Sequence, residues 1–251
     1  MVTRRLSRST IQIRTTNDVD VQATPAAQIP VFINNRDRLN STMKLVKWLR
    51  DAGTYNITIL DNGSTYPPLL EWYQEFDIKA VKYQQNLGPW SFWTQGMHLV
   101  QSTPYIVTDS DIVPSFCCPA NLIERCCKIL TNYPECGKVG PSLRLDNVPD
   151  LCRDFITNGD GKGWEGEGVF WKRRHTSGAF NAPLDTTFAV YKAFSPWVPA
   201  DWNNLRLDMP YTVEHTPWYI SKPFSDEEQY YREHANTTWS HVTWPSPIND
   251  A

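Results

Sequence analysis

The chain has 251 residues, and its 24 Lys and Arg against 27 Asp and Glu give a net charge of −3. This balance provides no basic surface for nucleic acid. A membrane-spanning helix needs about 18 consecutive apolar residues, and no apolar run is that long, so we expect no transmembrane segment. The length allows one large domain or two small ones around a sizeable core. Aromatic residues make up 13%, which is typical of proteins that bind sugars or nucleobases and equally of an aromatic-rich core.

The cysteines and the N-terminus indicate the compartment. Arginines near the start are followed by no apolar stretch, so they do not form a secretory signal. No cysteine lies in a Cys-x-x-Cys pair or at a zinc-like spacing to a histidine. We therefore expect most of them to be buried thiols in a reducing, cytoplasmic compartment, from which the protein can also associate with a membrane surface. The six positions are Cys117, Cys118, Cys126, Cys127, Cys136 and Cys152.

Residues 1–28 are polar without a sustained period, which predicts a flexible arm. After it, short apolar runs alternate with segments of helical periodicity. The predicted strands are residues 29–33, 57–60, 78–83 and 105–107, and the predicted helices are residues 39–49, a segment from Pro67 onward, and 90–100. Alternation as far as about residue 133 predicts an α/β fold with a doubly wound, mostly parallel sheet and right-handed crossovers.

The pattern is weaker in the second half. Residues 138–140 predict another strand, and 144–183 are rich in Gly, Asp and charged residues, which predicts long loops. Residues 186–191 predict a strand, and 225–235 predict a charged helix. We expect a loop-rich half here rather than further strand–helix repeats.

The strand at 105–107 leads into Thr108-Asp109-Ser110-Asp111. Side chains alternate along an extended chain, so Asp109 and Asp111 are expected to point the same way at the carboxyl edge of the sheet. Ligands bind at that edge in open α/β folds. Two like-facing carboxylates repel unless a cation lies between them, and their oxygens suit Mg²⁺ or Mn²⁺. An isolated Asp-x-Asp is also an ordinary polar turn, so the metal interpretation depends on the other strand ends.

Polar residues also follow the three earlier strands. They are Asn35 and Arg36 after the first, Asp61-Asn62-Gly63-Ser64 after the second, and Asn86-Leu87-Gly88 after the third. A carboxylate such as Asp61 can accept the N–H of a uracil ring, and Gly63 permits a close backbone approach. Each piece alone is compatible with a turn. Their placement at successive carboxyl ends of one sheet predicts a nucleotide site.

Together these segments resemble the GT-A fold glycosyltransferases grouped with the family-2 enzymes, which use a nucleotide-diphosphate sugar. The matching segments are residues 30–36, 59–65, 86–88 and 108–111, in the family's order. The resemblance implies one GT-A domain over 29–251, with a nucleotide-sugar half at 29–115 and an acceptor half at 116–251. It implies UDP as the nucleotide, Mn²⁺ or Mg²⁺ as the metal, and a glycan or lipid-linked glycan as the acceptor.

The resemblance also implies roles for individual residues. Asp61 would bind the base, and Asn35 and Arg36 would line the nucleotide pocket. Asp109 and Asp111 would belong to the metal motif that bridges the two phosphates of the donor. The remaining nucleotide-site residues by this resemblance are Asn62, Gly63, Asn86 and Gly88.

The acceptor half must supply further groups. Family members often have a late histidine that completes the metal shell, and His215, in a strand-like segment among aromatics, is the candidate here. A single histidine in such a segment is also compatible with ordinary packing. The rival histidines, His175 and His241, lie in charged or terminal segments.

An inverting transfer needs a carboxylate that takes the proton of the acceptor hydroxyl. Asp185, directly before the predicted strand at 186–191, is our candidate for this base. The family commonly places the base in a Glu-Asp pair, and the sequence has no such pair. Glu165 and Glu167, on a Gly-rich loop that can close over a donor, therefore remain alternatives.

Three other functions remain to be weighed. Asp109-Ser110-Asp111-Ile112-Val113 also fits the nucleophile motif of haloacid-dehalogenase-like phosphatases, which normally ends the first strand and needs a later Lys. A sugar nucleotidyltransferase would share the fold, but its Gly-rich phosphate loop is missing after the first strand. A catalytically inactive sugar-binding scaffold is the non-enzymatic alternative, although lectins are more often all-β. The leading prediction is a metal-dependent hexosyl- or pentosyltransferase.

Overall fold

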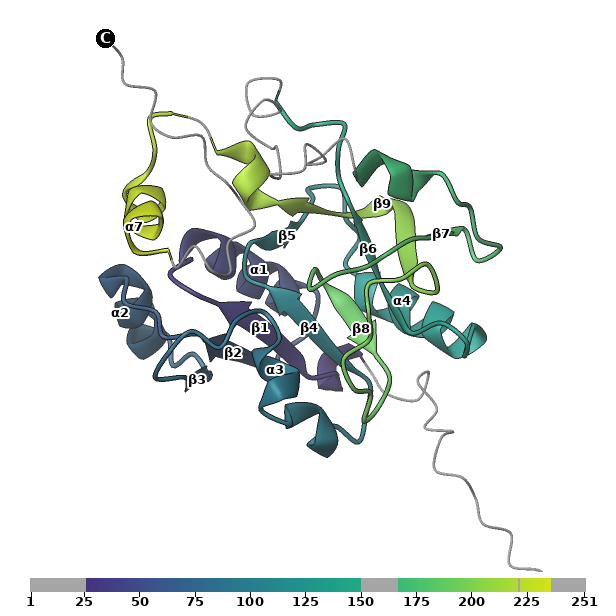
Figure 1. Ribbon diagram of the computed structural model, residues 1–251, viewed down its shortest axis with the longest axis horizontal. Helices are drawn as coiled ribbons and strands as arrows, with labels where there is room; N and C mark the ends of the chain where they lie inside the picture. Colours follow the sequence, from purple (N-terminus) through teal and green to yellow (C-terminus); the bar gives the residue numbers. More distant parts are fainter. Residues whose placement is uncertain (1–25, 150–166, 221, 236–251) are drawn as a thin grey trace, which may run out of the picture.

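The computed structural model describes residues 26–149, 167–220 and 222–235. Within these ranges one nine-stranded sheet runs in the order β3-β2-β1-β4-β8-β6-β9-β5, with β7 beside β9 (Figure 1). The strands are β1 Val31–Asn35, β2 Ile57–Asp61, β3 Ala80–Lys82, β4 Tyr105–Asp109, β5 Ile112–Pro114, β6 Lys138–Leu143, β7 Ala179–Asn181, β8 Ala189–Tyr191 and β9 Leu205–His215. The α-helices are α1 Asn40–Asp51, α2 Pro67–Glu75, α3 Ser91–Thr94, α4 Leu122–Asn132 and α7 Asp226–His234. Short 3₁₀ helices are η1 Ala26–Gln28, η2 Met97–Val100, η3 Gly168–Trp171 and η4 Thr216–Tyr219.

The first four strands form a parallel unit, as the alternating sequence pattern predicts. β1 lies between β2 and β4, and β3 pairs with β2, all in parallel. α1 buries Leu45, Val46 and Leu49 at helical spacing, which explains its amphipathic sequence. The α/β class is therefore confirmed. The predicted N-terminal arm lies outside the described residues except for η1.

The second half makes the sheet mixed, so the expectation of a mostly parallel sheet is wrong there. β8 pairs antiparallel with both β4 and β6, and β5 and β7 pair antiparallel with β9. Among the described strands of this half, only β6 and β9 pair in parallel. The predicted long loops at 144–183 lie partly outside the described residues, and the described part of this segment also contains η3 and β7.

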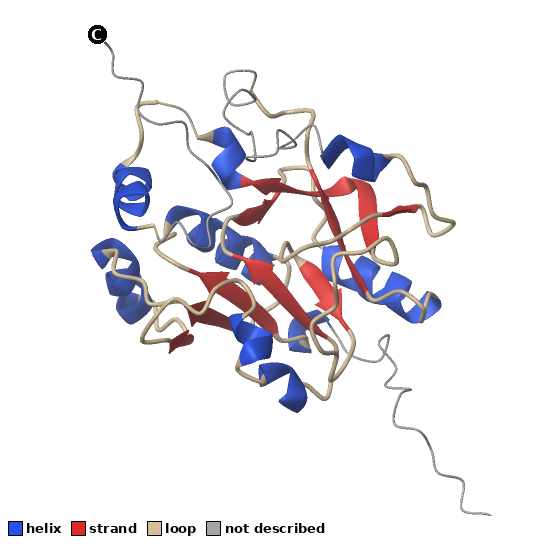
Figure 2. Ribbon diagram, viewed as in Figure 1, coloured by secondary structure: helices blue, strands red, loops and turns tan. Residues whose placement is uncertain are grey.

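Both faces of the central strands are buried. Along β1, Val31 and Ile33 pack into one apolar cluster while Phe32 packs into another, as side chains alternate along a strand. The first cluster includes residues of α1, α2 and α4, and the second includes residues of α3. Figure 2 shows these helices around the strands. Helices on both faces leave the strand ends as the place where a ligand can enter.

Some predicted elements differ in their bounds. The predicted helix at 90–100 is interrupted, because Gly96 adopts a left-handed φ of 69° between α3 and η2. Of the predicted strand at 186–191, only Ala189–Tyr191 form a strand, β8. The strand predicted at 138–140 is longer and forms β6, Lys138–Leu143. The charged segment at 225–235 is a helix, α7. None of the helices within the described ranges is long and apolar enough to cross a membrane.

The expectation of buried thiols is confirmed for Cys118, Cys126, Cys127 and Cys136. Cys117 is only partly buried, and Cys152 lies outside the described residues. Burial raises the pKa of the Cys136 thiol to about 11. Thiols held in this way are mostly protonated near neutral pH, which is typical of cysteines that pack rather than react.

Candidate functional site

A cavity of about 400 Å³ opens where β1 and β4 end, at the carboxyl edge of the parallel strands. Two smaller hollows of about 170 and 230 Å³ lie along α1, away from the two carboxylates of the Asp-x-Asp segment. Ten of the sequence-predicted site residues line the large cavity: Asn35, Arg36, Asn62, Asn86, Gly88, Asp109, Asp111, Glu167, Asp185 and His215. The structure thus brings together residues that lie up to 180 positions apart, His215 and Asn35 being the extremes.

Asp109 and Asp111 meet in this cavity through a turn. Asp109 is the last residue of β4, and Asp111 follows in the turn before β5, so strand alternation is the wrong reason for their convergence. The turn is fixed because the Ser110 N–H donates to the Asn34 carbonyl at 3.0 Å and the Thr216 N–H donates to the Asp111 carbonyl at 2.8 Å. Both carboxyl groups are therefore presented by backbone that is held on two sides.

The two carboxyl groups have different partners. The Thr186 hydroxyl donates to Asp109 Oδ2 at 2.6 Å, whereas Asp111 Oδ2 lies 3.4 Å from His215 Nε2. Burial and the neighbouring Asp111 raise the pKa of Asp109 well above its usual range. Burial alone would also raise the pKa of Asp111, but His215 and Arg38 outweigh it and hold that pKa below its usual value. A cation beside the pair would favour the ionised form of both.

His215 reaches Asp111 because β9 pairs with β5, where His215 lies opposite Ile112. Its ring makes an edge contact with Trp218, with centroids 5.1 Å apart. Its Nδ1 is buried and has no hydrogen-bond partner among the described residues. The His175 ring instead forms a hydrogen bond with Ser177 Oγ and packs edge-on against the Tyr133 ring. His241 lies outside the described residues.

Among the described residues no three His, Cys, Asp or Glu side chains are close enough to hold a metal by themselves. Asp111 and His215 form an adjacent pair, with Asp109 next to them in the same cavity. Mg²⁺ in particular is commonly held by one or two carboxylates together with substrate phosphates and water. The donor set therefore fits a divalent cation that shares its shell with a bound diphosphate.

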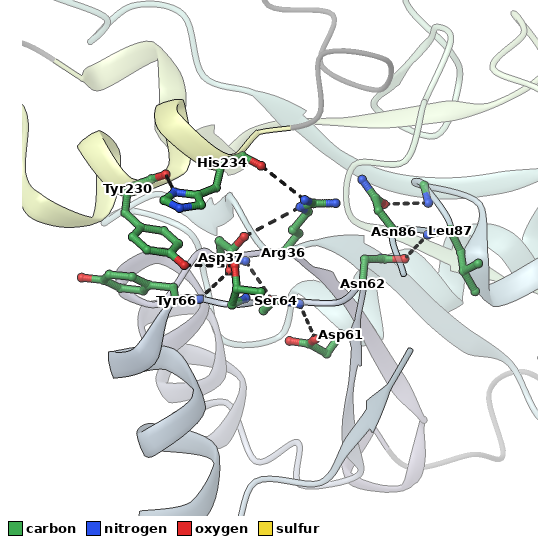
Figure 3. A network of polar contacts seen from close by, with 12 residues as sticks. Arg36, Asp37, Asp61, Asn62, Ser64, Tyr66, Asn86, Leu87, Tyr230 and His234 are labelled. Carbon is green, nitrogen blue, oxygen red and sulfur yellow. Dashed lines mark hydrogen bonds and ion pairs between the residues drawn. The ribbon is translucent and has the colours of Figure 1, made fainter. Parts of the chain in front are cut away.

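Asp61 does not line the cavity. Its side chain is buried, and the Tyr73 hydroxyl donates to its Oδ2 at 2.9 Å. The Ser64 N–H donates to its Oδ1 at 2.8 Å (Figure 3). Tyr73 in turn accepts from Asn35 Nδ2 at 2.9 Å, so Asp61 connects to the cavity through two side chains. Gly63 also lies outside the lining; its φ is 71°, and a Cβ there would approach the Gln85 backbone to 3.3 Å.

The candidate bases have different surroundings. Asp185 lines the cavity just before β8, and its carbonyl accepts from Lys138 Nζ at 3.4 Å. Glu167 also lines it, but its carboxylate is paired with Arg206, which is itself buried. Glu165 lies outside the described residues, so its role stays a prediction.

Sequence reasoning missed Arg38 and Tyr231, which also line the cavity. The Arg38 guanidinium lies 3.6 Å from the centre of the Tyr231 ring and pairs with Glu228 at 2.5 Å. The sequence does contain a signal for Arg38, because Arg36 and Arg38 follow the first strand two positions apart. The sequence contains no such signal for the contact with α7, because it joins residues 190 positions apart.

No protein-family model matches the sequence, and no curated protein matches it. One solved structure that matches is the mannosyltransferase PcManGT from Pyrobaculum calidifontis in complex with GDP-Man and Mn²⁺. The identity is 12% and the TM-score 0.45, over 67% of this chain and 45% of that chain. The present chain thus spans less than half the length of that chain. Similarity at this level does not establish the fold or the function of the present chain.

Proposed function

We propose that this chain is a metal-dependent glycosyltransferase of the GT-A fold, similar to the family-2 enzymes. It would transfer a hexosyl or pentosyl group from a nucleotide-diphosphate sugar to a hydroxyl of a glycan or lipid-linked glycan. The observation that supports this most is the composition of one cavity at the sheet edge. Asp109, Asp111 and His215 meet there, and a separate carboxylate, Asp185, lines the same cavity.

The polar side of the cavity suits the nucleoside. Asn35 lines it, and its Oδ1 is buried without a hydrogen-bond partner among the described residues. An unpartnered buried acceptor is costly, and the N–H of a nucleobase such as uracil would satisfy it. Asp61 would act in base binding by orienting Tyr73, which holds Asn35 in place. UDP is the nucleotide that we propose for this site.

The diphosphate would lie between the arginines and the acidic pair. Arg36 and Arg38 both line the cavity. The Arg36 Nε is buried without a hydrogen bond to the described residues, and its one ion pair there is with Asp37 Oδ2 at 3.7 Å. Guanidinium groups match phosphate oxygens in charge and geometry. Mn²⁺ or Mg²⁺ held by Asp111 and His215 beside Asp109 would stabilise the negative charge that grows on the leaving diphosphate.

Asp185 is the residue that we propose as the base. It would take the proton of the acceptor hydroxyl as that oxygen forms a bond to the anomeric carbon. The bond from the anomeric carbon to the diphosphate oxygen breaks at the same time, and its electron pair leaves with the diphosphate. Attack from the face opposite the leaving group inverts the anomeric configuration. Glu167 suits this step less well, because its carboxylate is already paired with Arg206.

The phosphatase alternative finds less support in the same cavity. A haloacid-dehalogenase-like site needs a lysine near the nucleophilic aspartate, and no lysine is among the described residues that line the cavity around Asp109. Asp109 also accepts a hydrogen bond from Thr186.

A turnover assay tests the proposal. UDP- and GDP-sugars are each incubated with the protein and Mn²⁺, and released nucleotide is measured with and without a chelator. The proposal predicts that one donor releases its nucleotide and that the chelator stops the release. Hydrolysis of a phosphomonoester without turnover of any sugar nucleotide would contradict it.

A further inference from the structure

The C-terminal helix α7 has an unusual buried face. Its two buried side chains are both glutamates, Glu227 at 7% and Glu228 at 3% exposure. Buried carboxylates are costly unless they are paired or accept hydrogen bonds. The partners of these two residues therefore define what α7 does in the fold.

Glu227 binds the start of α1. Its Oε2 accepts from the backbone N–H of Leu39 at 3.0 Å and of Asn40 at 2.8 Å. The residue at the N-cap of α1 provides no side-chain cap of its own. Glu227 therefore caps α1 from a distant helix and complements its dipole. This contact explains how α7 is attached, and it does not involve the cavity.

Glu228 binds Arg38 instead. Its Oε2 lies 2.5 Å from Arg38 Nη1, and its Oε1 accepts from Arg232 Nε at 2.7 Å. On the other side, the Arg38 guanidinium stacks on Tyr231, one helical turn along α7. Arg38 is thus held by two residues of one helix while it lines the cavity beside Asp111.

Helix α7 also contacts the segments that follow β1 and β2. The His234 carbonyl accepts from Arg36 Nη2 at 3.3 Å (Figure 3). The Tyr230 hydroxyl donates to Thr65 Oγ1 at 3.0 Å. Tyr230 packs against Tyr66, with ring centroids 5.0 Å apart. One helix from the acceptor half therefore contacts both cavity-lining arginines of the nucleotide half.

We propose that Glu228 is a positioning residue for the donor diphosphate. It fixes Arg38 in one orientation, so that the guanidinium is presented to the phosphates at no further cost in side-chain entropy. A guanidinium has five N–H donors, and the contact with Glu228 uses one side of it. This inference rests on the proposed function, since it names which residue prepares the anion site of that function.

The experiment compares a nucleoside with its diphosphate. Calorimetry with Mn²⁺ measures UDP, GDP, uridine and guanosine binding to the full chain and to Glu228→Ala. Loss of Arg38 positioning should weaken the affinity for the diphosphate by about tenfold and change the affinity for the nucleoside by less than about twofold. A general structural defect would weaken both ligands together.

Two matched variants on α7 separate positioning from attachment. Glu227→Ala removes the other buried glutamate and should lower the melting temperature while keeping the ratio of diphosphate to nucleoside affinity. Glu233→Ala removes an exposed charge from the same helix and should change neither. If Glu227→Ala lowers the ratio as much as Glu228→Ala, attachment of α7 rather than Arg38 positioning is responsible, and the inference is wrong.

Arg38→Lys provides a second route if Glu228→Ala does not fold. It keeps the charge but loses the planar fork and the stack on Tyr231, so it should show the same selective loss of diphosphate affinity.

Unchanged or tighter diphosphate binding in Glu228→Ala would mean that the carboxylate only neutralises Arg38. This result would overturn the inference but not the proposed function. Failure of the unaltered protein to bind any of these nucleotides would overturn the proposed function and this inference with it.

Discussion

Lys138 should make folding stability depend on pH in an unusual direction. Its side chain is fully buried in β6, and its Nζ donates to the carbonyls of Val198 at 3.0 Å and Asp185 at 3.4 Å and contacts the Tyr191 hydroxyl at 3.3 Å. Burial lowers the pKa of Lys138 to about 8 from its usual 10.5, although the charge of Asp185 acts in the opposite direction. Lys138 thereby connects the core to the segment that carries the proposed base.

The size of the effect follows from the difference between the pKa of Lys138 in the folded chain, about 8, and its ordinary pKa of 10.5. Below pH 8 the lysine is charged in both the folded and the unfolded chain, so the full cost of burying the charge, about 3 kcal/mol, is present. Between pH 8 and 10.5 the unfolded chain binds more protons than the folded one, so stability rises with pH. From pH 7 to about 9.5 this one group should add about 2 kcal/mol to the free energy of unfolding.

Urea unfolding at several pH values measures this, with Lys138→Met as the reference. Met has a similar length and no titrating group, so the difference in unfolding free energy between the two proteins isolates the lysine. We expect that difference to shift by about 2 kcal/mol in favour of the unaltered protein between pH 7 and 9.5. A difference that stays constant over this range would refute the reasoning, since it would mean that Lys138 keeps its ordinary pKa when buried.

Two further predictions concern the base and the packing of the sheet. Asp185→Asn should lower turnover by about a hundredfold or more while donor affinity stays unchanged, as measured by steady-state kinetics and calorimetry. Weakened donor binding with normal turnover would mean that another residue is the base, and Glu165 would be tested next. Gly140→Ala should destabilise the fold by about 3 kcal/mol or more, because its Cβ would lie 2.1 Å from the Phe188 carbonyl oxygen. Gly168→Ala, where nothing lies within 4 Å of the added Cβ, is the matched control and should change the urea midpoint little; equal midpoints for the two variants would contradict this.

The first, parallel half of the fold is predictable from sequence because its signals are local. Each of β1, β2 and β4 is a short apolar run followed by polar residues, and α1 shows its buried stripe directly in the spacing of its apolar residues. Parallel strands joined by helices bring their ends to one edge whatever their exact bounds. Asp109 and Asp111 therefore meet in the cavity even though the reason expected for their convergence was wrong.

The second half is less predictable because its arrangement depends on non-local pairing. His215 lies beside Asp111 only because β9 pairs with β5 in one register, which a single segment does not reveal. The position of Asp61 depends on Tyr73, whose hydroxyl takes one of its oxygens away from the cavity. The docking of α7 depends on two buried glutamates, and a charged helix read from sequence is normally expected to face solvent on those residues.

The central claim is that Asp111 and His215 hold a metal together with a nucleoside diphosphate. The most direct measurement is calorimetric titration of UDP, GDP and dTDP into the protein and into Asp111→Ala, each with and without Mn²⁺. We expect one nucleotide to bind the unaltered protein tightly only with Mn²⁺, and Asp111→Ala to lose the dependence on metal while keeping its fold. Binding that is equally tight without metal, or is unchanged in Asp111→Ala, would contradict it.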